Sequence, residues 1–280
     1  MKTVDTLVDD IYSLFKGHEC KPELIQEFAE DLSSVVANRL LHSGDAHGST
    51  LRMSNIGRAC DRQLYYDVNS KEEREPLLAH TKLKFLLGDI VESVLLFLTK
   101  EAGHTVEQEQ AEVTINGIKG HIDAIIDGAV VDVKSASSYA FKKFEDGTLP
   151  EQDSFGYIGQ ISAYKHALGT ERCGFLAMDK QNGSITFYEP PKEALMPVED
   201  RIDHLKAVVL MDEPPDRWFD AVPDGKSGNM KLPVECSYCN HKNTCYPLLR
   251  TFIYAGGRPV YLTEVIKEPK VFELVKEQSK

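Results

Sequence analysis

The chain has 280 residues, of which 42% are hydrophobic and 27% are charged, and its formal net charge is −12. This composition argues against wholesale disorder, and the negative charge argues against a protein that coats nucleic acid by electrostatics alone. It contains no run of about 18 apolar residues and no apolar segment near its acidic N-terminus, so we expect neither a membrane span nor a signal peptide. The expected setting is a reducing cytoplasm, or that of a host cell if the protein is viral.

The first part of the chain is predicted to be helical. Apolar residues recur at helical spacing within residues 24–40, and a polar loop follows over 42–50. Ser54 has the character of a helix N-cap, and the helix that it opens would carry Ile56 and Cys60. A long apolar helix is expected over 81–102, with Leu83 and Leu87 among its buried side chains.

The hydrophobic period then changes from that of a helix to that of a strand. Strands are predicted over 104–115, 119–126 and 129–134, and the hairpin turns Asn116-Gly117 and Asp127-Gly128 make them antiparallel neighbours. Helices are expected over 139–145, 155–168 and 197–210, and two more strands over 172–178 and 184–188. This order predicts an α/β fold in which helices flank a mixed central sheet.

Acidic residues and one lysine are predicted to converge on this sheet. Asp132 and Lys134 are two residues apart on one strand and share a face, although an ordinary surface strand would give the same alternation. Pairing across the Asp127-Gly128 turn brings Asp123 towards Asp132, and Glu92 on the long helix can reach the same place. Three close carboxylates repel one another, and hard oxygen ligands favour Mg²⁺ or Mn²⁺.

Such a site has the groups needed to hydrolyse a phosphodiester. A bound divalent ion polarises a phosphoryl oxygen and lowers the pKa of a bound water. A neighbouring lysine can orient that water or stabilise the developing negative charge.

These residues resemble a known family. Glu92, Asp123 and the Asp132-Val133-Lys134 triplet match the motifs of the PD-(D/E)xK nuclease superfamily in its RecB-like branch, and Gln160 and Tyr164 fit the QxxxY motif of that branch. The resemblance implies a restriction-endonuclease-like core. It also implies Mg²⁺ or Mn²⁺ bound by the three carboxylates and the Val133 carbonyl, with Lys134, Gln160 and Tyr164 completing the active site.

The resemblance further implies a DNA exonuclease that acts on single-stranded DNA with a free end. Repair, recombination, phage replication and CRISPR DNA processing all use such enzymes, so the resemblance extends to protein partners in recombination or replication. Two alternatives stay open: a structure-specific or duplex endonuclease of the same superfamily, and a non-catalytic DNA-binding or assembly subunit. No membrane partner is expected.

A second pattern involves four cysteines. Cys236, Cys239 and Cys245 form a C-x2-C-x5-C motif, and Cys60 lies far upstream. Four thiolates suit either Zn²⁺ or a [4Fe–4S] cluster, and sequence chemistry does not choose between them. In another reading, His241 is the fourth ligand of a zinc knuckle and Cys60 is a core thiol. The remaining two cysteines, Cys20 and Cys173, are interpreted as ordinary thiols.

The spacing of these cysteines resembles that of the iron–sulfur RecB-like exonucleases, which include the CRISPR-associated adaptation nucleases and the AddB nuclease domain. That resemblance favours a [4Fe–4S] cluster held by Cys60, Cys236, Cys239 and Cys245. It divides the chain into an N-terminal helical region (1–53), a nuclease domain with the cluster cysteines (54–246) and a C-terminal extension (247–280).

Overall fold

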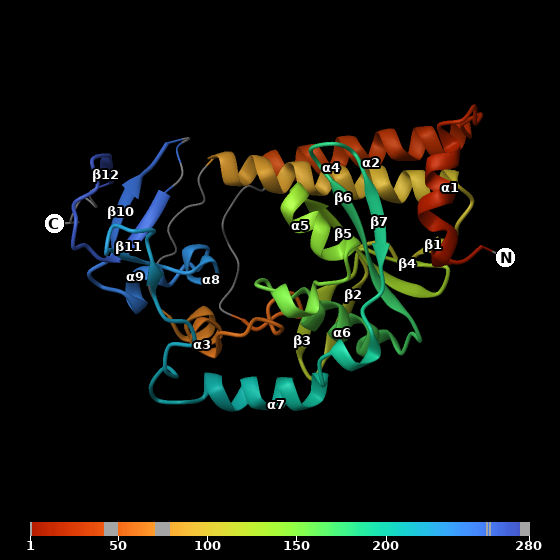
Figure 1. Cartoon of the computed structure of the whole chain (residues 1–280). Helices are drawn as coiled ribbons and strands as arrows, with labels where there is room; N and C mark the ends of the chain where they lie inside the picture. Colours follow the sequence, from red (N-terminus) through yellow and green to blue (C-terminus); the bar gives the residue numbers. More distant parts are fainter. Residues whose placement is uncertain (1, 42–49, 71–78, 256, 258, 275–280) are drawn as a thin grey trace. The chain divides into compact units, whose positions relative to one another are not determined.

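The computed structural model describes residues 2–41, 50–70, 79–255, 257 and 259–274 (Figure 1). The chain divides into two compact units, a first unit of residues 1–57 and 76–203 and a second unit of residues 58–75 and 204–280. The division at residues 53 and 246 expected from the sequence stays a prediction. None of the described helices is long and apolar enough to cross a membrane.

The first unit contains a five-stranded mixed sheet. Its strands occur in the order β1 (Val106–Glu107), β4 (Ala124–Ile126), β5 (Ala129–Ala136), β6 (Cys173–Asp179) and β7 (Ile185–Tyr188). The β5 and β6 strands are parallel, and the other neighbours are antiparallel. A separate hairpin pairs β2 (Glu112–Ile115) with β3 (Ile118–His121). The predicted α/β class with a mixed sheet is therefore confirmed.

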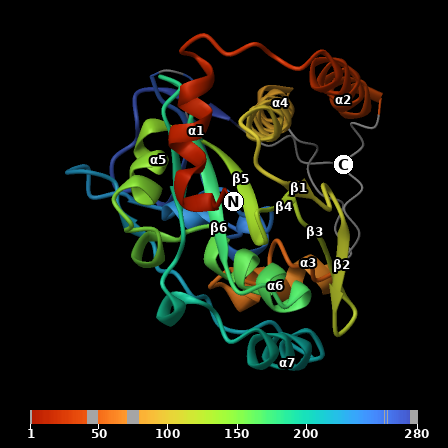
Figure 2. The same ribbon diagram turned by 90° about the vertical axis from the view of Figure 1, so that its right-hand side faces the viewer.

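Helices cover both faces of this sheet (Figure 2). On one face, Val131, Val133 and Leu176 pack with Leu7 of α1 and Leu95 of α4 in a hydrophobic core. Alternate strand residues point to the opposite face, where α5, α6 and a cluster of aromatic rings pack. The first-unit helices are η1 (Val4–Thr6), α1 (Leu7–Leu14), α2 (Pro22–Leu41), α4 (Ala79–Glu101), α5 (Ser138–Glu145), η2 (Pro150–Gln152), α6 (Tyr157–Leu168) and η3 (Lys192–Ala194).

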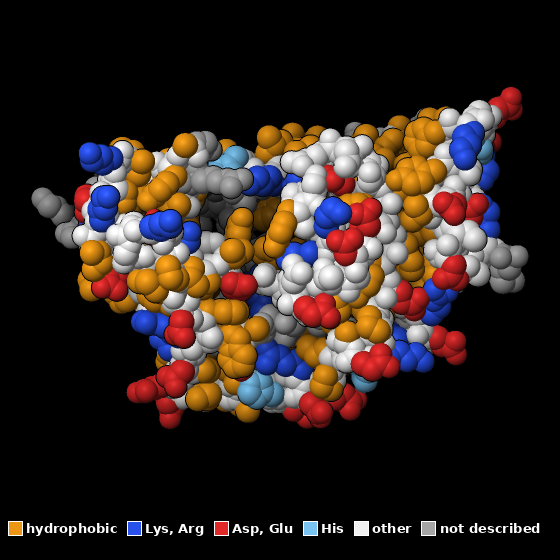
Figure 3. Space-filling view, viewed as in Figure 1, with side chains coloured by type: hydrophobic (Ala, Val, Ile, Leu, Met, Phe, Trp, Pro, Cys, Tyr) orange, Lys and Arg blue, Asp and Glu red, His pale blue; other side chains and the backbone are white. Residues whose placement is uncertain are grey.

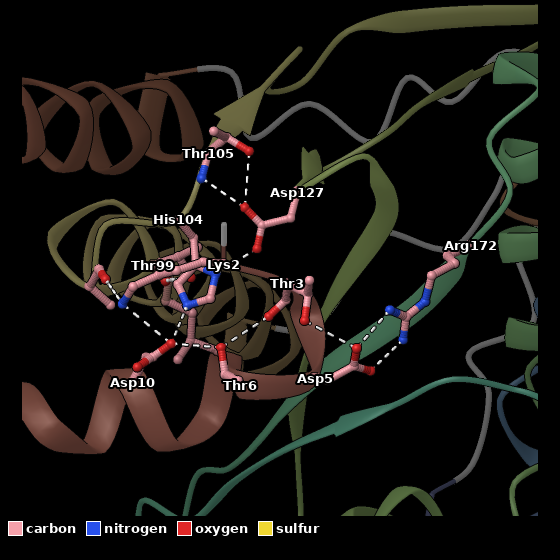
Figure 4. A network of polar contacts seen from close by, with 12 residues as sticks. Lys2, Thr3, Asp5, Thr6, Asp10, Thr99, His104, Thr105, Asp127 and Arg172 are labelled. Carbon is pink, nitrogen blue, oxygen red and sulfur yellow. Dashed lines mark hydrogen bonds and ion pairs between the residues drawn. The ribbon is translucent and has the colours of Figure 1, made fainter.

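A buried histidine attaches the N-terminal helix to the sheet (Figure 4). The His104 side chain has no exposed surface, and its Nδ1 lies 2.6 Å from Asp127 Oδ2 in the turn between β4 and β5. Its Nε2 lies 3.2 Å from Asp10 Oδ2 on α1. The backbone N–H and the hydroxyl of Thr105 both donate to Asp127 Oδ1 at 3.0 Å. One imidazole thus lies between carboxylates that are distant in sequence.

The two predicted hairpin turns are confirmed. Asn116 and Gly117 have φ values of 49° and 82°, and Asp127 and Gly128 have φ values of 47° and 81°. Two consecutive residues of positive φ define the turn type that matches the twist of a two-residue hairpin.

Two strand predictions were wrong in extent. The expected strand 104–115 is split into β1 and β2, because Gln108 and Gln110 adopt positive φ and turn the chain out of the main sheet. The expected strand 119–126 is split at Ile122 and Asp123, so β3 pairs with β2 while β4 pairs with β5.

Two helix predictions also need correction. Ser54 opens no helix, since residues 53–57 form turns and the next helix, α3, begins at Asp61. The loop expected at 42–50 lies almost entirely outside the described residues. Leu83 and Leu87 are 56% and 48% exposed, so the buried side of α4 is confined to its C-terminal half. Figure 3 shows hydrophobic side chains along the edge that α2 and α4 form.

The second unit combines short helices with a small antiparallel sheet. Helix α7 (Val198–Val209) leads into it from the first unit. The helices are α3 (Asp61–Asn69), α8 (Val234–Ser237) and α9 (Lys242–Cys245). The strands, in the order β12-β10-β11-β9-β8, are β8 (Val222–Pro223), β9 (Met230–Lys231), β10 (Arg250–Ile253), β11 (Pro259–Glu264) and β12 (Phe272–Leu274).

Candidate functional site

The pairing of β4 with β5 brings two of the predicted acidic residues together. Ala124 lies opposite Val131, so Asp123, one residue before β4, comes alongside Asp132. The backbone N–H of Val133 donates to Asp123 Oδ2 at 2.6 Å. Asp123 is therefore attached directly to the strand that carries Asp132 and Lys134.

Asp132 is a buried acid in the middle of the sheet. Its strand is flanked by β4 and β6, and the residue is only 1% exposed. Its Oδ2 forms an ion pair with Lys134 Nζ, whereas its Oδ1 accepts no hydrogen bond from the residues that the structure describes. A buried carboxylate oxygen without a donor is costly, and a bound cation would remove that cost.

Lys134 connects the acids to α6. Its Nζ lies 3.5 Å from Gln160 Oε1, and Gln160 Nε2 donates to the Tyr164 hydroxyl at 3.3 Å. The ammonium group also lies 4.5 Å from the centroid of the Tyr157 ring, within the range of a cation–π contact. Asp132, Lys134, Gln160 and Tyr164 thus form one continuous chain of polar contacts.

Two close backbone approaches position α6. A Cβ on Gly120 of β3 would lie 2.7 Å from Tyr164 Cε1, so only glycine leaves room for that ring. A Cβ on Gly159 would lie 2.3 Å from the Cα of Gly57, so the start of the helix packs closely against the turns at 53–57. The Asp153 carboxylate accepts hydrogen bonds from the first backbone N–H groups of α6 and fixes where the helix begins.

Glu92 completes the acidic group from α4. Its Oε1 accepts a hydrogen bond from Gln110 Nε2, and the backbone N–H of Gln110 donates to the Asp123 carbonyl at 3.1 Å. Gln110 has a φ of 54°, which non-glycine residues seldom adopt. Sequence reasoning missed Gln110 and Tyr157, because neither belongs to a recognised spacing and both contacts depend on tertiary packing.

The electrostatics of the site favour a positive charge. Burial, followed by the negative charge of Asp132, raises the pKa of Asp123 well above its usual range. Burial also raises the pKa of Glu92 to about 7, although the hydrogen bond from Gln110 opposes this. Burial alone would lower the pKa of Lys134, but the charge of Asp132 more than offsets it and the net shift is upward. Lys134 therefore stays protonated, but its single positive charge does not balance the three carboxylates around it.

The four predicted cysteines lie around one hollow in the second unit. The hollow has a volume of about 420 Å³, part of it open to solvent. Cys60 is the residue before α3, Cys236 lies in α8, and Cys245 ends α9. The hollow is lined by Cys60, Arg62, Gln63, Arg217, Trp218, Phe219, Glu235, Cys236, Cys239, Lys242, Cys245 and Tyr246.

Burial and mutual repulsion disfavour thiolates in this hollow when no cation is present. Burial, with the neighbouring sulfurs, raises the pKa of both Cys236 and Cys239 to about 12. Burial also raises the pKa of Cys60, against hydrogen bonds from backbone N–H groups that include that of Gln63. Bound iron or zinc would supply the positive charge that holds these ligands deprotonated.

The position of His241 bears on the zinc-knuckle alternative. Its Nε2 lies 3.0 Å from Asp67 Oδ1, and the residue is buried outside the lining of the hollow. Cys60, by contrast, shares the hollow with the other three cysteines. The structure therefore brings together the four-cysteine set rather than three cysteines and His241.

Comparison with known proteins yields distant structural similarities. No protein-family model matches the chain, and no curated protein does. The chain is similar to SSO0001 over 82% of its own length and 97% of that protein, with 23% identity and a TM-score of 0.44. It is also similar to the alkaline exonuclease LHK-Exo from Laribacter hongkongensis, at 16% identity and a TM-score of 0.36 over 55% of this chain and 89% of that one.

A third similarity is to a phage-related exonuclease from Haemophilus somnus 129PT. It extends over 56% of this chain and 92% of the other, with 12% identity and a TM-score of 0.38. The function proposed below therefore rests on this chain's own residues.

Proposed function

We propose that this chain is a metal-dependent DNA nuclease of the RecB-like PD-(D/E)xK type. The observation that carries the proposal is the state of Asp132: it is 1% exposed, and its Oδ1 lacks a hydrogen-bond donor among the described residues. Asp123 and Glu92, both with raised pKa values, lie beside it. Buried acids in this arrangement need a cation, and oxygen ligands of this kind favour Mg²⁺ or Mn²⁺.

The residues that would hold the ion are the carboxylates of Glu92, Asp123 and Asp132 and the carbonyl of Val133. When bound, the ion supplies Lewis-acid polarisation of a phosphoryl oxygen and an acidified water. The chain's own contribution is a rigid frame, because Asp132 lies on a central strand and the Val133 N–H fixes Asp123.

Lys134 is proposed to act on the attacking water. Its protonated amine donates hydrogen bonds that orient the water and stabilise the negative charge that develops on the phosphoryl oxygens. Gln160 and the Tyr157 ring restrict the lysine's position. The water oxygen bonds to phosphorus, the bond to the 3′ oxygen breaks, and the products are a 5′-phosphate and a 3′-hydroxyl. The water loses its proton to solvent, and the leaving oxygen gains one.

We also propose a [4Fe–4S] cluster as the resident group of the cysteine hollow. The layout of Cys60, Cys236, Cys239 and Cys245 resembles that of the iron–sulfur RecB-like exonucleases, and this resemblance supports a cluster over a single zinc ion. Burial beside neighbouring sulfurs raises the pKa of Cys236 and Cys239, so a bound cationic group is needed to keep them deprotonated. The cluster would fasten the start of α3 to the α8–α9 segment.

Single-stranded DNA with a free end is the proposed substrate, by family resemblance, and the proposed action is exonucleolytic. The test uses anaerobically purified full chain with Mn²⁺ or Mg²⁺ and linear single strands labelled at the 5′ or the 3′ end. Lys134→Ala is the catalytic variant. Lys180→Ala, which removes an exposed lysine just after β6, is the matched control.

The proposal expects the wild type and Lys180→Ala to release labelled nucleotides while Lys134→Ala does not. Cutting of circular single strands or of closed duplex would replace the exonuclease assignment with the endonuclease alternative. DNA binding without hydrolysis by the wild type under either metal would support the assembly-subunit reading instead.

A further inference from the structure

Three side chains of types that can ligate a metal converge at one end of α4, in the first unit and separate from both sites described above. His18 and Cys20 lie in the connection between α1 and α2, and Glu101 is the last residue of α4. One donor atom from each of them lies within 4.8 Å of the other two. His18 Nε2 lies 2.8 Å from Glu101 Oε2, so the imidazole and the carboxylate are already in contact.

The Glu101 carboxylate is fixed in place before any ligand binds. The residue is only 3% exposed. The backbone N–H of Lys21 donates to both of its oxygens, at 3.1 and 3.3 Å. Backbone donors of this kind orient a metal-binding carboxylate while leaving lone pairs free for the ion. Cys20 and His18 are exposed, so an ion can reach the three groups from solvent.

We propose that His18, Cys20 and Glu101 bind a divalent transition metal, specifically Zn²⁺. Imidazole nitrogen, thiolate sulfur and carboxylate oxygen are the three ligand types that zinc uses in proteins. Thiolate and imidazole also distinguish this site from the all-oxygen Glu92–Asp123–Asp132 cluster, which suits harder ions. The fourth zinc position would be filled by water, as in sites with three protein ligands.

Binding rearranges protons in a defined way. The Cys20 thiol loses one proton to solvent, and the His18 ring carries its proton on Nδ1 so that the Nε2 lone pair faces the ion. The thiolate and the carboxylate together carry two negative charges, which the dication neutralises. Lys21 keeps its hydrogen bonds to Glu101 throughout.

The position of the site indicates a structural effect. Helix α2 has no buried residues, and it is held to α4 by surface contacts. Among the described residues these contacts include the stacked rings of Phe28 and Phe97, 4.6 Å apart, and the ion pairs Lys100–Glu27 and Arg39–Asp89. Figure 1 shows α2 and α4 running side by side. An ion at His18, Cys20 and Glu101 would fasten the start of α2 to the end of α4.

The test measures zinc stoichiometry and the zinc-induced rise in thermal midpoint for the full chain with its cysteine cluster intact. Cys20→Ser and His18→Ala are the test variants, and both positions are exposed, so folding is expected to survive. Cys173→Ala is the control for the loss of a thiol, because Cys173 belongs neither to the four-cysteine set nor to these three residues, although it is buried in β6. Activity with Mn²⁺ on labelled DNA is followed in parallel.

The expected result is one equivalent of zinc less in Cys20→Ser than in the wild type. His18→Ala should bind zinc at least about tenfold more weakly. The zinc-induced rise in midpoint should be lost in both variants and kept in Cys173→Ala. Equal zinc stoichiometry in the wild type and Cys20→Ser would overturn the site, whatever the Mn²⁺-dependent activity shows. Loss of activity in Lys134→Ala tests only the proposed nuclease function and does not test the zinc site.

Discussion

Asp123 and Val133 lie on neighbouring segments, and a hydrogen bond of 2.6 Å joins the Asp123 Oδ2 to the Val133 backbone N–H. This contact aligns Asp123 with Asp132 and forces two carboxylates into one buried region. It is the reason that the negative charge of the site cannot relax by side-chain movement. The site is therefore expected to weaken the metal-free fold, and Glu92 provides a way to measure that effect.

Glu92→Gln should stabilise the metal-free protein at alkaline pH. The pKa of Glu92 is raised from 4.5 to about 7 by burial first and by the charge of Asp132 next. A group with a raised folded pKa contributes stability that is complete below its unfolded pKa and is lost as the pH rises through the folded value. As the pH rises from 4.5 to 8, the thermal midpoint of the wild type should therefore fall by several degrees relative to that of Glu92→Gln.

Glu92→Gln should also lower the rate of DNA hydrolysis and weaken the stabilisation of the fold by Mn²⁺. With one charged ligand fewer, we expect hydrolysis to fall by about a hundredfold or more, the order of loss seen when one preorganised charge interaction is removed. The Mn²⁺-induced rise in midpoint at pH 8 should also shrink. Glu107→Gln, at an exposed position of β1, is the control and should alter neither quantity. Equal pH profiles for wild type and Glu92→Gln would contradict the assignment.

Gln110 is expected to position Glu92. Gln108 and Gln110 both have a φ of 54° and both are exposed, but only Gln110 donates to the Glu92 carboxylate. Gln110→Ala should weaken Mn²⁺ binding by about 10- to 100-fold, as loss of a ligand-orienting contact does. Gln108→Ala, which removes an equivalent side chain from the same turn, should leave it unchanged. Metal titrations of activity and of thermal midpoint both report this difference, and equal effects would rule out the positioning role.

Much of this arrangement could be predicted from sequence, because it depends on local periodicity. The Asp127-Gly128 turn fixed the β4–β5 register, and that register placed Asp123 beside Asp132. Helical spacing of four residues placed Gln160 and Tyr164 on one face. Both relations need only a turn type and a period, which neighbouring residues specify.

The remainder depends on contacts between segments that are distant in sequence. The turn at Gln108–Gln110 carries no glycine, so nothing in its composition marked the positive φ that splits the expected strand. Cys20 was interpreted as an ordinary thiol because Glu101 is far along the chain, and only the packing of the α1–α2 connection against α4 brings them together.

Gly120→Ala should destabilise the fold and disturb Tyr164. A Cβ at Gly120 would lie 2.7 Å from Tyr164 Cε1 and 2.8 Å from Met53 Cβ, and overpacking of this kind costs roughly 1–3 kcal/mol. Gly88→Ala is the matched substitution, since nothing lies within 4 Å of its Cβ and it occupies a helix interior. It should raise stability by about 0.5–1 kcal/mol. Urea unfolding of both variants measures the contrast, and a neutral Gly120→Ala would show that α6 can shift.

The cysteine hollow makes a distinct prediction about its fourth ligand. Cys60→Ser should remove the broad visible absorbance of an iron–sulfur cluster and lower the thermal midpoint, because α3 would no longer be fastened to the α8–α9 segment. His241→Gln should keep the absorbance, since His241 contacts Asp67 rather than the hollow. Stoichiometric zinc without iron in anaerobically purified protein would replace the cluster with the zinc alternative. Loss of metal in His241→Gln but not in Cys60→Ser would reverse the ligand assignment.

Asp127→Asn should lower the free energy of unfolding near neutral pH, and its effect should diminish at acid pH. Burial alone would raise the pKa of Asp127, but hydrogen bonds from His104 and Thr105 outweigh it, so the net shift is downward from 3.8. A lowered folded pKa gives stability that is present above the unfolded value and is lost as the pH falls through the folded one.

The wild type should therefore be more stable than Asp127→Asn near pH 7, and the difference should shrink as the pH falls below about 4. Asparagine tolerates positive φ, so the turn at Asp127 with φ 47° is kept and only the charge changes. Asp203→Asn, at an exposed position of α7, is the control and should show no such convergence. Urea unfolding from pH 3 to pH 7 gives the three curves. Because Asp127 contacts the His104 imidazole that also faces Asp10 of α1, a constant difference at all pH values would mean that the network stabilises the N-terminal helix by packing rather than by charge.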